Sequence, residues 1–233
     1  MTKRTSSKSS AGQVNSQWKG NSAVMSMFGL ANSYQTYYTV SNLLKQKGDI
    51  MTFQEMLEKR ESCRAYSDRP VSREDLMKLV EAGRLSPSGC NAQPWKFIVV
   101  DDPAAKEKLC DALVVENGAT GVPFREQVPA YIILVEQPAK VVPFVKAHYG
   151  ETQRFAQGDI GMAAMNMCYQ ALELGLSTCI LGLNDQKKME QYFGIPEGSE
   201  VRIVLAVGYA AKDEPPRRKI RKSIEEVCSF NQW

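Results

Sequence analysis

From Met51 onward, apolar positions follow two spacings, one typical of helices and the other of strands. Thr52 with Glu55 three residues later forms a capping box, which predicts a helix running to about Arg60. Ser72 opens a second helix in the same way, with Leu76, Leu79, Val80 and Gly83 on one face. Further helices are predicted over about 104–114, 152–174 and 185–193, and strands over about 96–100, 131–135, 178–181 and 202–208.

These helices and strands alternate along the chain, so they are expected to surround a single sheet. The predicted helix over 152–174 is apolar almost all round its middle, which indicates burial. Gly158, Gly161, Ala163 and Ala164 would let another helix approach it closely. The pattern by itself predicts an α/β or α+β protein.

Residues 1–50 differ from the rest in composition. Their first half is rich in Ser, Thr, Lys, Gln and Asn, and such sequence cannot bury enough apolar surface to order itself. They hold six of the 29 Lys and Arg residues but only one of the 26 acidic residues. No apolar stretch here is long enough for a secretory signal. We expect 1–50 to be a basic, poorly ordered extension, with an organellar presequence as the alternative, and 51–233 to form one domain.

Composition narrows the class of protein further. Hydrophobic residues make up 43% and charged residues 24%, which is ordinary for a globular protein, and the net charge of +3 is too small to indicate nucleic acid. No apolar run approaches the ~18 residues of a membrane span. Six cysteines without a Cys-x-x-Cys spacing predict reduced thiols and a cytoplasmic location. The single histidine excludes a zinc site with several histidines, and no metal is expected.

A first cluster of candidate binding residues follows the first helix. Beyond the helix end the chain is expected to be extended, which would place Arg60, Ser62 and Arg64 on one side. Two guanidinium groups and a hydroxyl on one side suit a phosphate, because arginine offers a planar fork of donors. A solvated charged face at a helix end is the alternative.

A second cluster lies in the loop 86–95, between the second helix and the first strand. Two prolines, a glycine and small polar residues make this loop stiff. Ser88, Asn91 and Gln93 offer donors and acceptors that suit the edge of a heteroaromatic ring. The alternative is an ordinary turn.

A third cluster lies near the C-terminus, where Lys219 and Arg221 follow Arg217 and Arg218. In an extended chain Lys219 and Arg221 share a face. By itself such a basic run is most often a solvated tail.

Together these features resemble the nitroreductase family of flavin enzymes. The resemblance rests on Arg-x-Ser-x-Arg at 60–64, Pro-Ser-x-x-Asn-x-Gln-Pro-Trp at 87–95, the helix ending in Leu-Gly-Leu-Ser-Thr-Cys at 174–179, Val-Gly-Tyr at 207–209 and the late basic pair. It covers Met51 to about Val227, and it depends on the order and spacing of the motifs. It implies an α+β fold with a three-layer α/β/α sheet flanked by helices, and a homodimer with FMN at the interface.

Carried over residue by residue, the resemblance also implies a cofactor site. Arg60, Ser62 and Arg64 would hold the phosphate, the ribityl chain and the ring edge. The loop residues Pro87, Ser88, Asn91 and Gln93 would contact the flavin, partly from the partner subunit. Ile180, Leu181 and Gly182 would pack near the ring, and Lys219 and Arg221 would complete the phosphate clamp. A variable lid is expected within 115–155, with Phe124, Phe144, His148 and Tyr149 as candidates.

The implied activity is NAD(P)H-dependent reduction of nitroaromatics, quinones or related electrophiles by a ping-pong mechanism. FMN carries the chemistry, so no catalytic side chain is expected. A Gly-x-Gly-x-x-Gly fingerprint and a P-loop are both missing from the sequence, which argues against a Rossmann dehydrogenase and an ATPase. Two alternatives stay open: a reductive dehalogenase of the iodotyrosine deiodinase type, and a flavin-binding or redox-sensing protein without useful turnover.

Overall fold

Four antiparallel strands form the sheet at the centre of the chain. They are β1 (Trp95–Val100), β2 (Ala130–Glu136), β3 (Ser177–Leu181) and β4 (Glu200–Gly208), in the order β1-β2-β4-β3. Each pair of neighbours is antiparallel. All four predicted strands are therefore confirmed, and the antiparallel pairing decides for α+β over α/β.

The structure, a computed structural model, describes residues 51–115, 118–138, 142–149, 155–212 and 217–233. The predicted extension 1–50 lies outside the described residues, so its lack of order stays a prediction. The first residues of the helix predicted from 152 also lie outside them.

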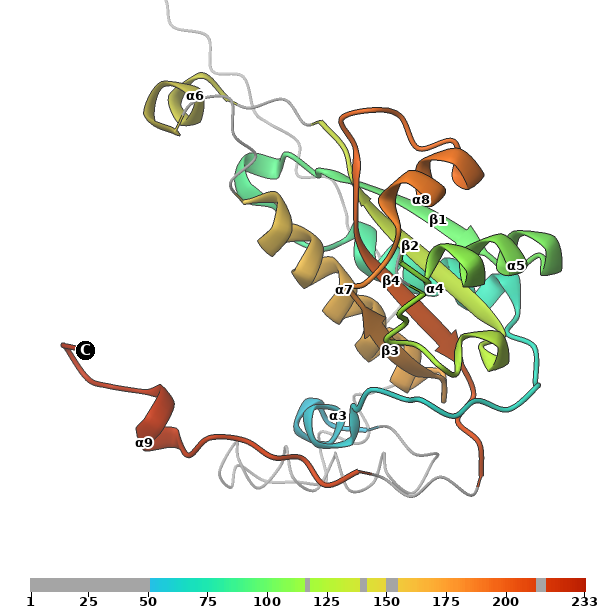
Figure 1. Cartoon of the computed structure of the whole chain (residues 1–233). Helices are drawn as coiled ribbons and strands as arrows, with labels where there is room; N and C mark the ends of the chain where they lie inside the picture. Colours follow the sequence, from blue (N-terminus) through green and yellow to red (C-terminus); the bar gives the residue numbers. More distant parts are fainter. Residues whose placement is uncertain (1–50, 116–117, 139–141, 150–154, 213–216) are drawn as a thin grey trace, which may run out of the picture. The chain divides into compact units, whose positions relative to one another are not determined.

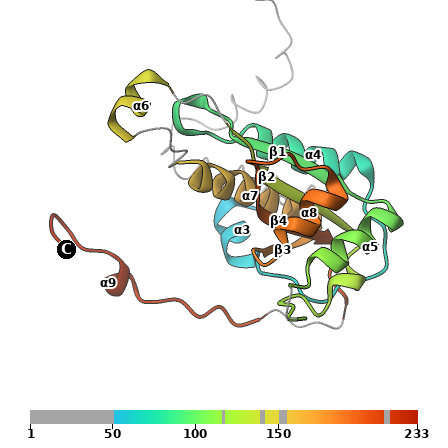
Figure 2. The same cartoon turned by 45° about the horizontal axis from the view of Figure 1, so that its top comes forward.

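Helices cover both faces of the sheet, which makes three layers (Figure 1). One face is covered by α4 (Arg73–Arg84) and α7 (Ala156–Glu173), and the other by α5 (Pro103–Ala112) and α8 (Gln186–Phe193). The turned view in Figure 2 shows the same arrangement. The expected three-layer fold is confirmed.

Strand β2 shows how the sequence produces two cores. Successive side chains of a strand point to opposite faces. Ile132 and Leu134 pack in the core shared with α4 and α7, whereas Tyr131, Ile133 and Val135 pack in the core on the other side. All seven residues of β2 are buried, as expected for a central strand covered on both faces.

The helices begin where the capping residues predict. The capping box of Thr52 and Glu55 is formed at the start of α3 (Phe53–Lys59). The side chains of Ser72, Asp102 and Asp185 cap α4, α5 and α8. Four short elements were not predicted: the 3₁₀ turns η1 (Gly89–Asn91) and η2 (Arg125–Gln127), and the helices α6 (Pro143–Tyr149) and α9 (Ile224–Val227).

Helix α7 is buried on one side only, which differs from the expected burial all round. Ala163, Ala164 and Met167 are fully buried against the sheet and α4, whereas Met162 is 42% exposed. A Cβ placed on Gly158 or Gly161 would have no described atom within 4 Å. Within the described part of the chain, the outer face of α7 is thus open around Gly158, Gly161 and Met162, whereas Tyr169 nearer its end contacts Phe53 of α3 with ring centroids 5.4 Å apart.

The segment after α3 runs beside the edge strand β3. Ser62 forms a parallel bridge with Thr178, and the Cys63 amide donates to the Thr178 carbonyl at 2.9 Å. Tyr66 then pairs with Ala210, just beyond the end of β4. The stretch after α3 is therefore extended, as predicted, and is held against the sheet.

Gly208, at the end of β4, gives a test of this packing. An added Cβ would lie 2.6 Å from Pro129 side-chain atoms and 2.8 Å from Tyr66 Cδ1. We expect Gly208→Ala to lower the free energy of unfolding by about 1–3 kcal/mol, because none of these ring atoms can move away easily. Urea denaturation measures the change. Gly121→Ala is the control, since its Cβ would meet only Leu183 at 3.9 Å, and equal stability of the two variants would contradict the packing.

Candidate cofactor site

A cationic cleft lies where the end of α3 meets the C-terminal segment. Its volume is about 260 Å³. The cleft is lined by Arg60, Glu61, Ser62, Arg64, Arg217, Arg218, Lys219, Ile220 and Arg221. It unites the first and third sequence clusters, which lie at opposite ends of the domain.

The backbone after α3 positions the first wall of the cleft. Arg60 is the C-cap residue of α3, and its amide donates to the Met56 carbonyl. Pairing with β3 then extends the chain, so that Arg60, Ser62 and Arg64 all line the same cleft. These three predicted residues therefore line one cleft, together with Glu61 between the first two.

The C-terminal segment forms the second wall and is fastened to the first. The Arg217 amide donates to the Glu61 carboxylate at 2.9 Å. The Lys219 ammonium donates to the carbonyls of Leu57 and Glu58 in the last turn of α3. A cation here satisfies carbonyls that have no partner inside the helix, so Lys219 stabilises the helix end as well as lining the cleft.

The charge balance of the cleft identifies the kind of ligand it suits. Six of its nine lining residues are Arg or Lys, and Glu61 is its single acid. Such a cluster attracts a multiply charged anion. The arginines can grip phosphate oxygens in pairs. The cleft therefore fits the phosphate of FMN, but its volume is below that of a typical ligand pocket, so the ring must extend beyond it.

Two buried thiols lie near this cleft. Burial raises the pKa of Cys179, although Arg64 and a hydrogen bond with Ser62 act in the opposite direction. Burial likewise raises the pKa of Cys168, opposed by a hydrogen bond with Thr178. Both groups stay protonated at neutral pH, so neither is a thiolate nucleophile.

The loop 86–95 does not line the cleft. The Gly89 amide donates to the Asp159 carboxylate in the first turn of α7, and Asn166 Nδ2 donates to Ser86 Oγ at 2.7 Å. The loop thus lies along α7 between Asp159 and Asn166, whereas the cleft lies near β3, which follows the end of α7. The structure does not bring the two predicted halves of the site together within one chain.

The polar residues of this loop point outward. Asn91 and Gln93 are exposed, and Gln93 Nε2 donates to Asn91 Oδ1 at 3.2 Å. Ser88 Oγ accepts from the Gln93 amide at 2.9 Å. Pro87 is also exposed. These side chains are free to meet a ligand or a second molecule.

The three residues predicted near the ring differ in orientation. Ile180 is 37% exposed and Gly182 is exposed, so both can contact a ligand. Leu181 is different, because its side chain lies in the core on the α5 and α8 side. Leu181 can therefore face a ligand only through its backbone.

The lid candidates fall into two groups. Phe124 is buried in the same core with its ring 6.1 Å from that of Tyr66, so its assignment to a lid was wrong. Phe124 lies with Val122 and Val128 in the core on this face of the sheet. The sequence around Phe124 did not indicate that this segment folds back onto the sheet. Phe144 and His148 are exposed on α6, with ring centroids 4.2 Å apart. Tyr149 ends that helix, and its side chain lies outside the described part.

Asp159 is a site residue that the motifs did not indicate. It is 4% exposed in the first turn of α7 and accepts from the amide of Gly89, 70 residues earlier. A lone acid at the start of an otherwise apolar helix was the signal available in the sequence.

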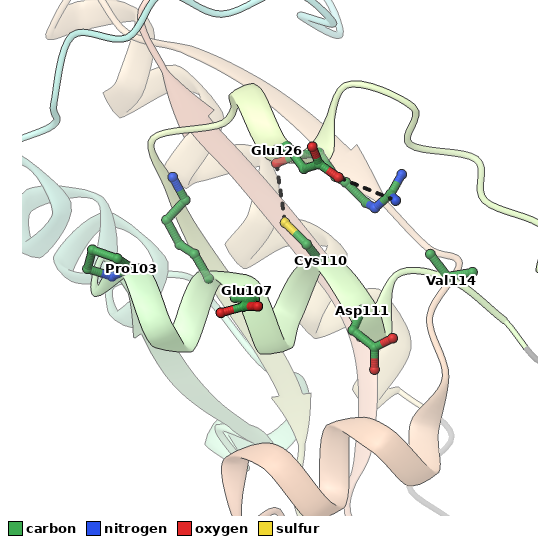
Figure 3. A pocket seen from close by; sticks show the side chains of 8 residues that line it. Pro103, Glu107, Cys110, Asp111, Val114 and Glu126 are labelled. Atoms are coloured by element: carbon green, nitrogen blue, oxygen red, sulfur yellow. Dashed lines mark hydrogen bonds and ion pairs between the residues drawn. The ribbon is translucent and has the colours of Figure 1, made fainter.

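A larger hollow beside α5 has a different character (Figure 3). Its volume is about 570 Å³, and Lys106, Glu107, Arg125 and Glu126 give it mixed charge. Its Asp111 already accepts from Lys188 and Tyr192. Burial raises the pKa of its Cys110 thiol. The smaller cleft is the better cofactor candidate, because all but one of its charged residues are positive and these cations come from two predicted clusters.

The described residues offer neither a membrane-spanning helix nor a cluster of metal ligands. In the part of the chain that the structure describes, no helix is both long and apolar enough to cross a membrane. The same residues contain no group of three His, Cys, Asp or Glu side chains that could hold a metal ion.

Comparison with known proteins identifies the family. The model of the nitroreductase family matches residues 57–209, from α3 to just past β4. The chain belongs to the nitroreductase family. This match takes in the first wall of the cationic cleft, the loop 86–95 and the whole sheet.

Relatives of this nitroreductase-family chain share most of its length. A protein of Archaeoglobus fulgidus with NAD(P)H nitroreductase in its name is 31% identical over 167 residues, which cover 68% of this chain and 85% of the relative. An NADPH-dependent oxidoreductase of Staphylococcus aureus is 28% identical over 186 residues, with coverages of 76% and 72%.

Solved structures show the same fold. A nitroreductase family protein of Clostridium difficile 630 has a TM-score of 0.65 at 26% identity, covering 78% of this chain and all of that protein. An FMN-dependent nitroreductase of Clostridium difficile R20291 has a TM-score of 0.58 at 27% identity, with coverages of 76% and 98%. The nitroreductase fold is thus present.

Proposed function

We propose that this chain binds FMN and uses NAD(P)H to reduce nitroaromatics, quinones or related small electrophiles. The observation that carries the proposal is the cationic cleft, because six positive side chains around one acid favour the binding of an anion of high charge. The fold supports it, as does the similarity to an FMN-dependent nitroreductase and an NADPH-dependent oxidoreductase.

In this proposal the chain holds the cofactor and positions it. Arg60 and Arg221 would bind the phosphate, Ser62 would donate from its hydroxyl to the ribityl chain, and Arg64 would contact the ring edge. Lys219 would add charge while it holds the end of α3. FMN, when bound, would supply the redox chemistry by accepting hydride from NAD(P)H and passing electrons to the acceptor. The two substrates would use one face in turn, which gives ping-pong kinetics.

The second half of the site would come from a second copy of the chain. The exposed amides of the loop do not line the cleft of their own chain, because the turn that carries them is attached to the first turn of α7 through Asp159, whereas the cleft lies beside β3. A homodimer that packs the two copies against each other could place the loop of one beside the cleft of the other.

Two uncovered apolar surfaces support this assembly. The outer face of α7 carries the exposed Met162 and two glycines with open space, which suits close helix packing. The C-terminal segment exposes a further set of apolar side chains. They are Ile220, Ile224, Val227, Phe230 and Trp233. Surfaces of this kind mark interfaces in soluble proteins.

Turnover is the direct test of the proposed function. The purified full chain, reconstituted with FMN, is mixed with NADH or NADPH and then with nitrofurazone. We expect the yellow absorbance to bleach with at least one nicotinamide and nitrofurazone to be consumed catalytically. Bound flavin that neither nicotinamide reduces would favour a flavin-binding protein, and turnover of a halotyrosine but not of nitrofurazone would favour a dehalogenase. Either result would contradict the proposal.

The clamp assignment has its own test. We expect Arg60→Ala and Arg221→Ala each to weaken FMN binding about tenfold or more, because each removes a charge-assisted contact with the phosphate. Flavin fluorescence quenching measures the dissociation constants. Arg84→Ala is the matched control, since among the described residues Arg84 pairs with Glu81 on the exposed side of α4 and does not line the cleft. Unchanged affinity in both clamp variants would show that the phosphate binds elsewhere.

Complementation tests whether the site is shared between subunits. One variant carries Arg60→Ala with Arg221→Ala, and the other carries Asn91→Ala with Gln93→Ala. Each alone should bind little FMN. Random dimers of the co-expressed variants should recover about a quarter of the wild-type flavin content, because each mixed dimer contains one intact site. No recovery, with mixed dimers confirmed by affinity tags, would place the whole site in one chain.

A further inference from the structure

The turn that carries Asn91 and Gln93 has an unfavourable backbone. Cys90, Asn91 and Gln93 have φ values of 53°, 54° and 47°, in the left-handed region that side chains with a Cβ rarely adopt. Asparagine tolerates this region, whereas cysteine and glutamine do so less readily. Three such residues within four positions persist only where surrounding contacts hold them.

One of these contacts comes from Asp159. Its two carboxylate oxygens lie 3.1 and 3.2 Å from the Gly89 amide nitrogen, directly before the left-handed residues. The Asp159 side chain is buried, and in the described part of the chain no Lys or Arg forms an ion pair with it. A buried carboxylate is costly unless it is hydrogen-bonded, so the Gly89 amide is an important partner for this charge.

Close packing reinforces the same contact. A Cβ on Gly89 would lie 3.2 Å from Phe155 Cβ, so the turn approaches the start of α7 as closely as a glycine allows. On the far side of the turn, Ser88 Oγ accepts from the Gln93 amide. The turn is thereby held at both ends, while the side chains of Asn91 and Gln93 stay exposed.

We propose that Asp159 is a positioning residue, whose buried carboxylate holds the Gly89 amide and keeps residues 90–93 in the conformation that presents Asn91 and Gln93 to the flavin ring. This inference rests on the proposed function for its ligand. Among the described residues, the two exposed amide side chains form hydrogen bonds only within the turn, from Gln93 Nε2 to the side chain and the carbonyl of Asn91. The strained turn is therefore explained by a ligand-facing role, as strained backbone often is at binding sites.

The test compares Asp159→Ala and Asp159→Asn with the wild type. Hydrogen exchange of the Gly89 amide, followed by NMR without FMN, reports whether the turn is held. The dissociation constant of FMN reports whether the ligand senses the turn. We expect Asp159→Ala to speed Gly89 exchange and to weaken FMN binding, each by about tenfold or more. Asp159→Asn keeps an acceptor but loses the charge, so we expect changes of about threefold.

Asp111→Ala is the matched control. Asp111 is also a carboxylate that joins two elements, because it accepts from Lys188 and Tyr192 of α8, but it lies away from the cleft and the loop. We expect this variant to lose thermal stability while both readouts stay within about twofold of the wild type. Equal effects of Asp111→Ala and Asp159→Ala would overturn the positioning role.

The outcomes separate this inference from the proposed function. Failure of the wild type to bind FMN would overturn the proposed function, whatever Gly89 exchange shows. Normal FMN binding by the wild type, with unchanged Gly89 exchange in Asp159→Ala, would overturn the role of Asp159 alone. If Asp159→Ala does not fold, Asp159→Asn decides, and unchanged Gly89 exchange in that variant would overturn the role.

Discussion

Repulsion among the positive side chains of the cationic cleft is the constraint on which the site depends. Arg60, Arg64 and Arg221 lie with three further cations around a volume of about 260 Å³, and Glu61 is the single acid among the residues that line it. Glu61 also fastens the C-terminal segment by accepting from the Arg217 amide. A doubly charged phosphate would remove most of the remaining repulsion, so ligand binding and the docking of the C-terminal segment should favour each other.

Helix α7 organises the rest of the site. Its inner face forms the core with the sheet and α4, and its first turn holds the loop 86–95 through Asp159. The helix leads into β3, whose edge carries Ser62 and its neighbours. The turn that carries Asn91 and Gln93 is thus attached at the start of α7, whereas the cleft lies beside the strand that follows the end of this helix. The same helix leaves an apolar outer face, which suits the assembly that would bring the two halves together.

Much of the fold follows from patterns that act over a few residues. The capping box at Thr52 placed α3, and the apolar runs placed all four strands, because capping and period-two burial are local properties. Short elements such as η1 and α6 escaped prediction, since a single turn has no periodicity to detect. Phe124 was misassigned because an aromatic residue in a loop has the same local signal whether it lies in a core or over a ligand.

The sequence by itself determined the family, the order of helices and strands, and which cations follow α3 and β4. Only the tertiary structure decided which of these residues meet. Glu61 and Arg217 are 156 residues apart, and Gly89 and Asp159 are 70 apart, so no local pattern connects them. Their contacts depend on how the helices pack on the two faces of the sheet, and that packing is a property of the whole folded chain.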